Sequence, residues 1–139
     1  MIGQLATIDE VKTFALAGNA TITLVSKATG NRFTFKIRKP GEDTPHFVKL
    51  LRGPENESDY TFLGTIFDTG EYRHGRRSQV GADAPSAKAF EWFWRHLEMG
   101  DLSPKLEVWH EGRCGRCGRK LTVPESIASG MGPECAGRM

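Results

Sequence analysis

The three cysteines of this 139-residue chain lie close together in the sequence, at Cys114, Cys117 and Cys135. Cys114 and Cys117 form a Cys-x-x-Cys pair in which a glycine follows each cysteine, and glycine permits the tight turn that directs two thiolates at one ion. Three cysteines cannot all pair with one another, so a disulfide framework explains them poorly. The spacing predicts a zinc knuckle, with Cys135 as the third ligand after a hairpin and a short helix.

Three thiolates leave one position of a tetrahedral zinc site to be filled. His110 stands four residues before Cys114, and Gly112 between them gives the backbone freedom to turn the imidazole toward the metal. We therefore predict a site with three cysteines and one histidine. The alternatives are a histidine from another element, a neighbouring carboxylate or a water in an open position, and the residues concerned are His46, His74, His96 and Glu111.

The segment that carries these cysteines has few large apolar side chains, so burial alone gives it little stability. Structural zinc sites bind with apparent free energies of about 10 to 16 kcal/mol near neutral pH, which supplies what the small core lacks. A redox-active Cys-x-x-Cys is an alternative, but such a pair usually opens a helix after a buried strand, whereas here Gly and Arg surround it. Zn²⁺ is thus the predicted cofactor, in a structural role.

The rest of the chain has the length and the apolar content of one ordinary domain. Thr7 and Glu10 form a capping box at the start of one helical pattern, and Pro85 begins a second, longer one. Between them the apolar period is two, as in β-strands, and turn signals separate the runs. The predicted helices cover residues 8–16 and 85–98, and the predicted strands cover 20–26, 32–38, 47–51, 60–67, a short one around 72, and 106–109.

These elements predict an α+β fold, in which an antiparallel β-meander is flanked by two helices and followed by a small treble-clef-like zinc module. The predicted division is an α+β domain over residues 1–105 and a zinc-binding module over residues 106–139 that packs on it. Nothing in the sequence resembles a linker or an internal repeat, which favours close packing of the two parts.

The charge of the chain is nearly balanced, because 19 Lys and Arg oppose 17 Asp and Glu for a formal net charge of +2. So small an excess does not by itself indicate an anionic partner, and any case for nucleic acid rests on local clusters. No apolar run approaches the ~18 residues that would span a bilayer, and the first residues lack the pattern of a secretory signal. We expect a cytoplasmic protein with no membrane partner.

The sequence from Cys114, Cys-Gly-Arg-Cys-Gly-Arg-Lys-Leu-Thr-x-Pro-Glu-Ser-Ile, is followed by Gly-x-Gly-Pro-Glu-Cys-Ala-Gly-Arg, which ends at Arg138. This pattern closely resembles a small zinc module of unknown function that is common in bacteriophage, prophage and actinobacterial reading frames, and the resemblance covers residues 110–139. It implies a bound metal and a mobile-element setting, with the host cytoplasm as the compartment if a phage encodes the protein. It implies no activity.

A catalytic zinc keeps an open position for water beside a general base, and a site closed by His110 has no such position. Glu111 or Glu134 would act as a base only in an open-site version. The sequence lacks the zinc-deaminase pattern, a Gly-rich phosphate loop and a Gly-x-Ser-x-Gly elbow. We predict no enzymatic activity, no catalytic residues and no small-molecule substrate.

Two clusters of basic residues indicate nucleic acid. In the knuckle cluster, arginines recur at every third position and project guanidinium groups from a tight turn toward phosphates; its members are Arg113, Arg116, Arg119 and Lys120. The loop cluster combines positive charge with an aromatic ring for stacking on a base; its members are Tyr72, Arg73, Arg76 and Arg77. Solvated surface arginines are the alternative interpretation of either cluster. We predict a non-enzymatic accessory protein that binds DNA or RNA.

The competing hypothesis is a phage-encoded inhibitor or adaptor that binds a host protein or a ribonucleoprotein complex, such as a defence system. Aromatic residues are concentrated before the cysteines, and Trp and Arg are the side chains that most often anchor interfaces. The apolar stripe of the helix over 85–98 accounts for most of these aromatics as core residues. Trp92 lies off that stripe and is the candidate contact.

Overall fold

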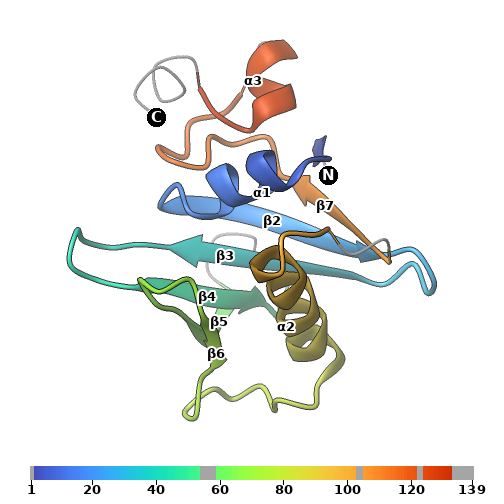
Figure 1. Cartoon of the computed structure of the whole chain (residues 1–139), viewed down its shortest axis with the longest axis vertical. Coiled ribbons are helices and arrows are strands. Elements are labelled where there is room, and N and C mark those ends of the chain that lie inside the picture. Colours follow the sequence, from blue (N-terminus) through green and yellow to red (C-terminus); the bar gives the residue numbers. More distant parts are fainter. Residues whose placement is uncertain (1, 54–58, 103–104, 122–123, 133–139) are drawn as a thin grey trace.

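The computed structural model describes residues 2–53, 59–102, 105–121 and 124–132 and shows a mixed α+β fold (Figure 1). Within these residues there are three helices and one seven-stranded antiparallel sheet. The elements in chain order are β1 (Gly3–Leu5), α1 (Ile8–Ala15), β2 (Asn19–Ser26), β3 (Arg32–Arg38), β4 (His46–Leu51), β5 (Tyr60–Ile66), β6 (Tyr72–His74), α2 (Pro85–Glu98), β7 (Leu106–His110) and α3 (Pro124–Ser129).

The strands lie in the order β1-β7-β2-β3-β4-β5-β6. The consecutive run from β2 to β6 is the predicted antiparallel meander, and it is confirmed, including the short strand at Tyr72. β7 follows the predicted boundary at residue 105, yet it lies inside the sheet between β1 and β2. The sheet therefore joins residues from both sides of that boundary.

The first helix begins at the predicted capping box. The Thr7 hydroxyl accepts a hydrogen bond from the Glu10 amide at 3.2 Å, and the Thr7 amide donates to the Glu10 carboxylate at 3.2 Å. Both bonds satisfy amides that the first helical turn leaves without a partner in the helix. The buried residues Val11, Phe14 and Ala15 lie at helical spacing, so α1 turns one face to the core.

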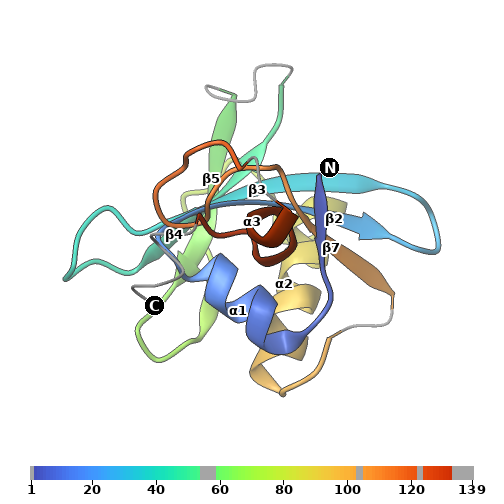
Figure 2. The ribbon, with the colours of Figure 1, turned by 90° about the horizontal axis from the view of Figure 1, so that it is seen from above.

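The second helix also follows its predicted pattern, with Pro85 at its start. Its apolar stripe is buried, and the Trp94 indole N–H donates to the carbonyl of Gly70 at 2.7 Å. Phe90, at the centre of the stripe, contacts Phe35 of β3 with ring centroids 5.0 Å apart. α1 and α2 lie together on one side of the sheet (Figures 1 and 2).

The main core lies between that side of the sheet and the two helices. The strands alternate as expected, and their inward residues are fully buried: Ile22, Leu24, Phe35, Ile37, Val48 and Leu63. None of the described helices packs on the opposite side, which we call the open face (Figure 2). Among the described residues there is also no helix with the length and apolarity that a membrane span requires.

Candidate functional site

Residues 113–120, which we call the knuckle, form a tight hairpin around the Cys-x-x-Cys pair. The Cys114 amide donates to the carbonyl of Arg119 at 2.8 Å, and the Gly118 amide donates to the carbonyl of Cys114 at 2.9 Å. Gly118 has a φ of +78°, a left-handed conformation that strongly favours glycine. Arg113 and Lys120 close the hairpin as a single antiparallel bridge. This is the turn that the spacing of glycine and cysteine predicted.

Several hydrogen bonds converge on the sulfur of Cys114, which is buried, whereas Cys117 is exposed. The Arg116 amide lies 3.4 Å from this sulfur. Burial raises the pKa of the Cys114 thiol, but hydrogen bonds from the amides of Cys117, Gly132 and Arg116 and from the Cys117 thiol outweigh it and lower the pKa to about 7. A sulfur so surrounded by donors is suited to the thiolate form, the form that binds metal.

The third predicted ligand, Cys135, lies outside the described residues. In the part of the chain that is described, no group of three or more histidine, cysteine or acidic side chains is placed to hold a metal ion. The described donors are therefore the two thiols of the knuckle. The Gly132 amide, three positions before Cys135 in the sequence, hydrogen-bonds to the sulfur of Cys114.

His110 is fully buried and both of its ring nitrogens are engaged. Nδ1 accepts a hydrogen bond from the Gly112 amide at 3.0 Å, which leaves the proton on Nε2, and Nε2 donates it to the carbonyl of Ile127. The imidazole thus connects the end of β7 to α3. To bind a metal, it would have to exchange one of these hydrogen bonds.

The other candidates for the fourth ligand lie in separate environments. His46 contacts the carbonyl of Leu16 at 3.1 Å, and His74 contacts the carbonyl of Val80 at 2.8 Å. His96 lies on α2 with its ring against Trp92. Among the described residues, none of these three imidazoles joins the knuckle thiols in a group that could hold a metal ion.

The loop cluster does not form the stacking surface that the sequence suggests. Tyr72 packs against Phe90 with ring centroids 4.8 Å apart, and burial, with a smaller contribution from Glu91, raises the pKa of its hydroxyl. Arg73 pairs with Glu71 at 3.2 Å on the surface. The members that remain exposed after β6 are Arg76 and Arg77.

The knuckle cluster lies far from the loop cluster in the order of the sheet. The knuckle follows β7, next to β2, whereas Arg76 and Arg77 follow β6 at the opposite edge. The members of the knuckle cluster are exposed on the hairpin: Arg113, Arg116, Arg119 and Lys120. The two basic clusters are therefore separate surfaces, and the open face of the sheet lies between them.

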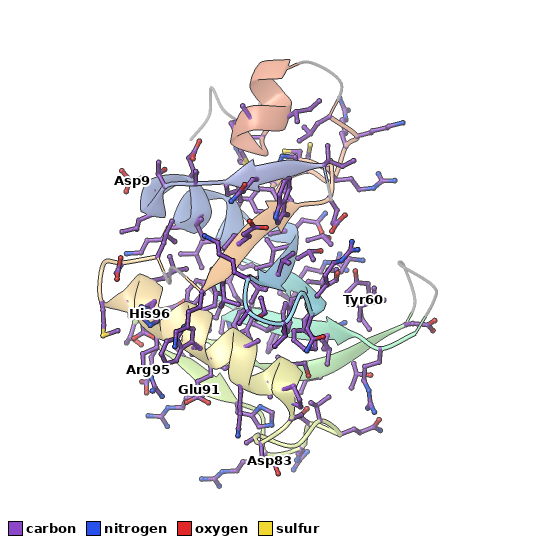
Figure 3. All side chains as sticks on the ribbon, turned by 90° about the vertical axis from the view of Figure 1, so that its right-hand side faces the viewer. Asp9, Tyr60, Asp83, Glu91, Arg95 and His96 are labelled. Atoms are coloured by element: carbon purple, nitrogen blue, oxygen red, sulfur yellow. The ribbon has the colours of Figure 1, made fainter. Side chains whose placement is uncertain are left out.

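A groove of about 660 Å³ runs over this open face beside the knuckle. Its wall on one side is formed by Arg113 and Gly118 of the knuckle, and on the other by Tyr60 of β5. Figure 3 shows Tyr60 on the side of the sheet away from Glu91, Arg95 and His96 of α2. The remaining lining residues are Asn19, Thr21, Thr34, Lys36, Leu51 and Glu111.

The strand register explains how these side chains come together. Thr21 of β2 pairs with Lys36 of β3, Lys36 pairs with Lys49 of β4, and Lys49 pairs with Phe62 of β5. Residues paired across a sheet point to the same face, so this row crosses the open face from strand to strand. The Lys36 ammonium lies 4.6 Å from the ring centroid of Tyr60, within the range of a cation–π contact.

The groove was not predicted from the sequence, although part of its signal is present there. Thr34 and Lys36 alternate with the buried Phe35 and Ile37, so their position on the polar face could have been predicted. Their closeness to Tyr60 and Arg113 could not, because it depends on pairings between strands that are distant in sequence.

Taken together, the fold and the groove define a mixed α+β protein with one helix-covered face and one open face bordered by a two-thiol hairpin. Residues 105–139 match a family of unknown function (DUF6011). The matched segment contains β7, the knuckle and α3, but not the strands that form the rest of the groove. Neither the curated proteins nor the solved structures include a significant match to this sequence.

Proposed function

We propose that this protein is a non-enzymatic accessory protein that binds single-stranded DNA or RNA across its open face. The observation that carries the proposal is the groove in which Lys36 lies over the Tyr60 ring and Arg113 forms the facing wall. Proteins that bind single strands combine a positively charged groove for the backbone with aromatic rings on which bases stack. An open sheet face with aromatic side chains is one way to present both.

The positive charges around the groove support binding of an anionic ligand. On the open face, Lys36 and the exposed Lys49 are paired neighbours, and Arg38 is exposed two residues further along β3. The four basic side chains of the knuckle cluster extend the positive surface beyond Arg113. In this proposal the knuckle cluster contacts phosphates, while Arg76 and Arg77 lie too far across the sheet to share the groove.

In this proposal, the thiolates of Cys114, Cys117 and Cys135 hold a structural zinc ion. Two features of the described residues fit such an ion: the two thiols of the knuckle lie within hydrogen-bonding distance of each other, and backbone amides surround the sulfur of Cys114. When bound, the metal would hold the hairpin rigid and so fix Arg113 at the edge of the groove. His110 is the proposed fourth ligand only if it exchanges its hydrogen bond to Ile127 or Gly112.

The binding test uses fluorescence anisotropy with a labelled single-stranded oligonucleotide and two groove variants. Tyr60→Ala should weaken binding about tenfold, because stacking one base on an aromatic ring is worth about 1–3 kcal/mol. Lys36→Ala should weaken binding and lower the slope of log affinity against log salt by about 1, because one fewer counterion is released.

The matched controls lie on α2, on the other side of the sheet. Trp92→Ala removes an exposed aromatic ring, and Arg95→Ala removes an exposed positive charge. Neither should change affinity by more than about twofold, since surface substitutions away from the site act weakly. If the α2 variants weaken binding as much as the groove variants do, the open face is not the binding surface.

A second candidate function is favoured by the outer surface of α2. Trp92 is 41% exposed and Met99 is 64% exposed, and such side chains often anchor protein interfaces. A phage-encoded inhibitor or adaptor would use this surface to bind a host protein or a ribonucleoprotein. Capture of a host complex from lysate that survives nuclease treatment and is lost in Trp92→Ala would favour this function over direct binding of nucleic acid.

A further inference from the structure

Trp109 lies on the open face at the far end of a row of side chains that begins at Tyr60. Trp109 of β7 pairs with Thr23 of β2, and Thr23 pairs with Thr34 of β3. Thr34 lines the groove together with Leu51 and Tyr60, which pair across β4 and β5. Residues paired across a sheet point to the same face, so the row runs over five strands with an aromatic ring at each end.

The two rings at the ends of this row are too far apart to stack on the same base. Three strands separate β5 from β7 in the sheet. Steps of about 4.8 Å between neighbouring strands therefore place the two ends of the row about 19 Å apart. A stacked single strand advances about 3.4 Å per nucleotide and covers this distance in about six nucleotides, whereas a more extended strand needs fewer.

The setting of Trp109 is suited to stacking. Its side chain is half-buried, and its indole N–H donates a hydrogen bond to the Glu107 carboxylate at 3.3 Å. This bond lies at the edge of the ring, so it orients the indole without using the faces on which a base stacks. Tyr60, at the other end of the row, already lines the groove of the proposed function.

The charges beside the row favour a strand whose bases face the sheet and whose phosphates lie at the borders of the row. Glu107 and Glu111 stand two residues on either side of Trp109, and their carboxylates repel phosphates but not the face of a base. Arg32, exposed at the start of β3, and Arg113 of the knuckle lie on opposite sides of the row. These two arginines are therefore placed to contact phosphates on both sides of the bases.

We infer that Trp109 is the second stacking residue of the proposed nucleic-acid site, and that a single strand of about four to six nucleotides crosses the sheet from Tyr60 to Trp109. This course of the strand rests on the proposed function and adds the length of ligand that the site takes. The competing course follows β4 and β5, where Phe47 and Phe62 also lie on the open face with ring centroids 6.5 Å apart. A strand on that course does not reach β7.

The test measures the affinity of labelled single-stranded oligonucleotides of increasing length, from two to about ten nucleotides. Affinity should rise steeply up to about six nucleotides, because a strand of that length reaches both rings, and only slowly beyond it. Trp109→Leu should weaken binding of the six-nucleotide strand about tenfold, because one base loses its stacking partner. In this variant the affinity should level off at about three nucleotides.

Phe62→Leu is the matched control, because it removes an aromatic ring from the same face but away from the row; affinity should change by less than about twofold. Trp109→Phe should restore most of the affinity that Trp109→Leu loses, since a phenyl ring also stacks on a base. The slope of log affinity against log salt should stay unchanged in Trp109→Leu and fall by about 1 in Arg32→Ala, because only the arginine is charged. Thermal unfolding midpoints of all variants show whether the fold is retained.

Tryptophan fluorescence gives a second measurement that leaves position 109 intact. In Trp92→Phe the remaining indoles are Trp109 and Trp94, and Trp94 is only 3% exposed. A strand of about six nucleotides should quench the emission, because a base stacked on an indole quenches its fluorescence. A dinucleotide, which is too short to reach from the groove to Trp109, should quench it much less.

The outcomes distinguish the course of the strand from the proposed function. Affinity that does not rise with length, absence of quenching, or a loss in Phe62→Leu without a loss in Trp109→Leu overturns the course from Tyr60 to Trp109 and leaves single-strand binding in place. Absence of binding at every length overturns both.

Discussion

At the scale of single residues, the position of His110 in the sequence and its contacts in the structure indicate two different roles. Its position four residues before Cys114 predicts a metal ligand, whereas the structure uses both nitrogens for hydrogen bonds to Gly112 and Ile127. A histidine that is fully buried between β7 and α3 stabilises the junction whether or not a metal is bound. Spacing alone cannot distinguish these roles, because both require an imidazole at the same place.

His110→Ala should lower the free energy of unfolding by about 2–4 kcal/mol, because it leaves the Gly112 amide and the Ile127 carbonyl without partners in a buried site. Urea unfolding measures this loss. The metal content of the folded variant, measured in parallel, determines the fourth ligand: zinc at full stoichiometry limits His110 to the structural role. As the control, His46→Ala alters a histidine that is only half-buried and should cost less.

At the scale of elements, local patterns were sufficient to predict most helices and strands. The capping box at Thr7, the alternation in residues 20–26 and 32–38 and the apolar stripe after Pro85 all correspond to observed elements. The short helix expected between Cys117 and Cys135 is present as α3, whereas the described hairpin, closed by the bridge from Arg113 to Lys120, surrounds the Cys-x-x-Cys pair itself. β1 was not predicted, because three residues are too few to show a period.

The capping box permits a direct test at this scale. Thr7→Ala should lower the free energy of unfolding by about 1 kcal/mol, because the side-chain acceptor for the Glu10 amide is lost. Thr7→Ser should restore most of that stability. Thr13→Ala, an exposed position within the same helix, serves as the control and should be neutral or slightly stabilising, since alanine has the higher helix propensity. A loss in Thr13→Ala as large as that in Thr7→Ala would contradict a specific role for the cap.

At the scale of the whole molecule, the two faces of the one sheet differ in what covers them. The helices cover one face of the sheet (Figure 2) and the main core lies beneath them, whereas the groove lies on the other face. The knuckle contacts both regions. Gly115 packs so closely on Phe14 of α1 that an added Cβ would lie 2.8 Å from its ring, while Arg113 lines the groove. A change in the knuckle should therefore act on the groove through Arg113 and on the packing of α1 through Gly115.

Removal of the proposed zinc tests this division. A chelator should leave the near-ultraviolet signal of the buried Trp94 and the protection of β2 and β3 against hydrogen exchange largely unchanged, because the residues that bury these elements lie in the main core. Residues 113–121 should lose protection, and affinity for the oligonucleotide should fall several-fold because Arg113 is no longer held in place. Cooperative unfolding of the entire chain on chelation would show instead that the core depends on the metal.

The sequence by itself determined the local elements, the inward stripes of the helices and strands, and the pair of thiols in a tight turn, because each depends on neighbours within a few residues. Only the tertiary structure decided that β7 lies between β1 and β2 and that Tyr60, Lys36, Glu111 and Arg113 line one groove. These arrangements depend on pairings across most of the chain and on a shift in the register of β4 against β5 between Val48 and Lys49. A one-residue difference in such a register moves a side chain to the other face of the sheet, and no local pattern encodes it.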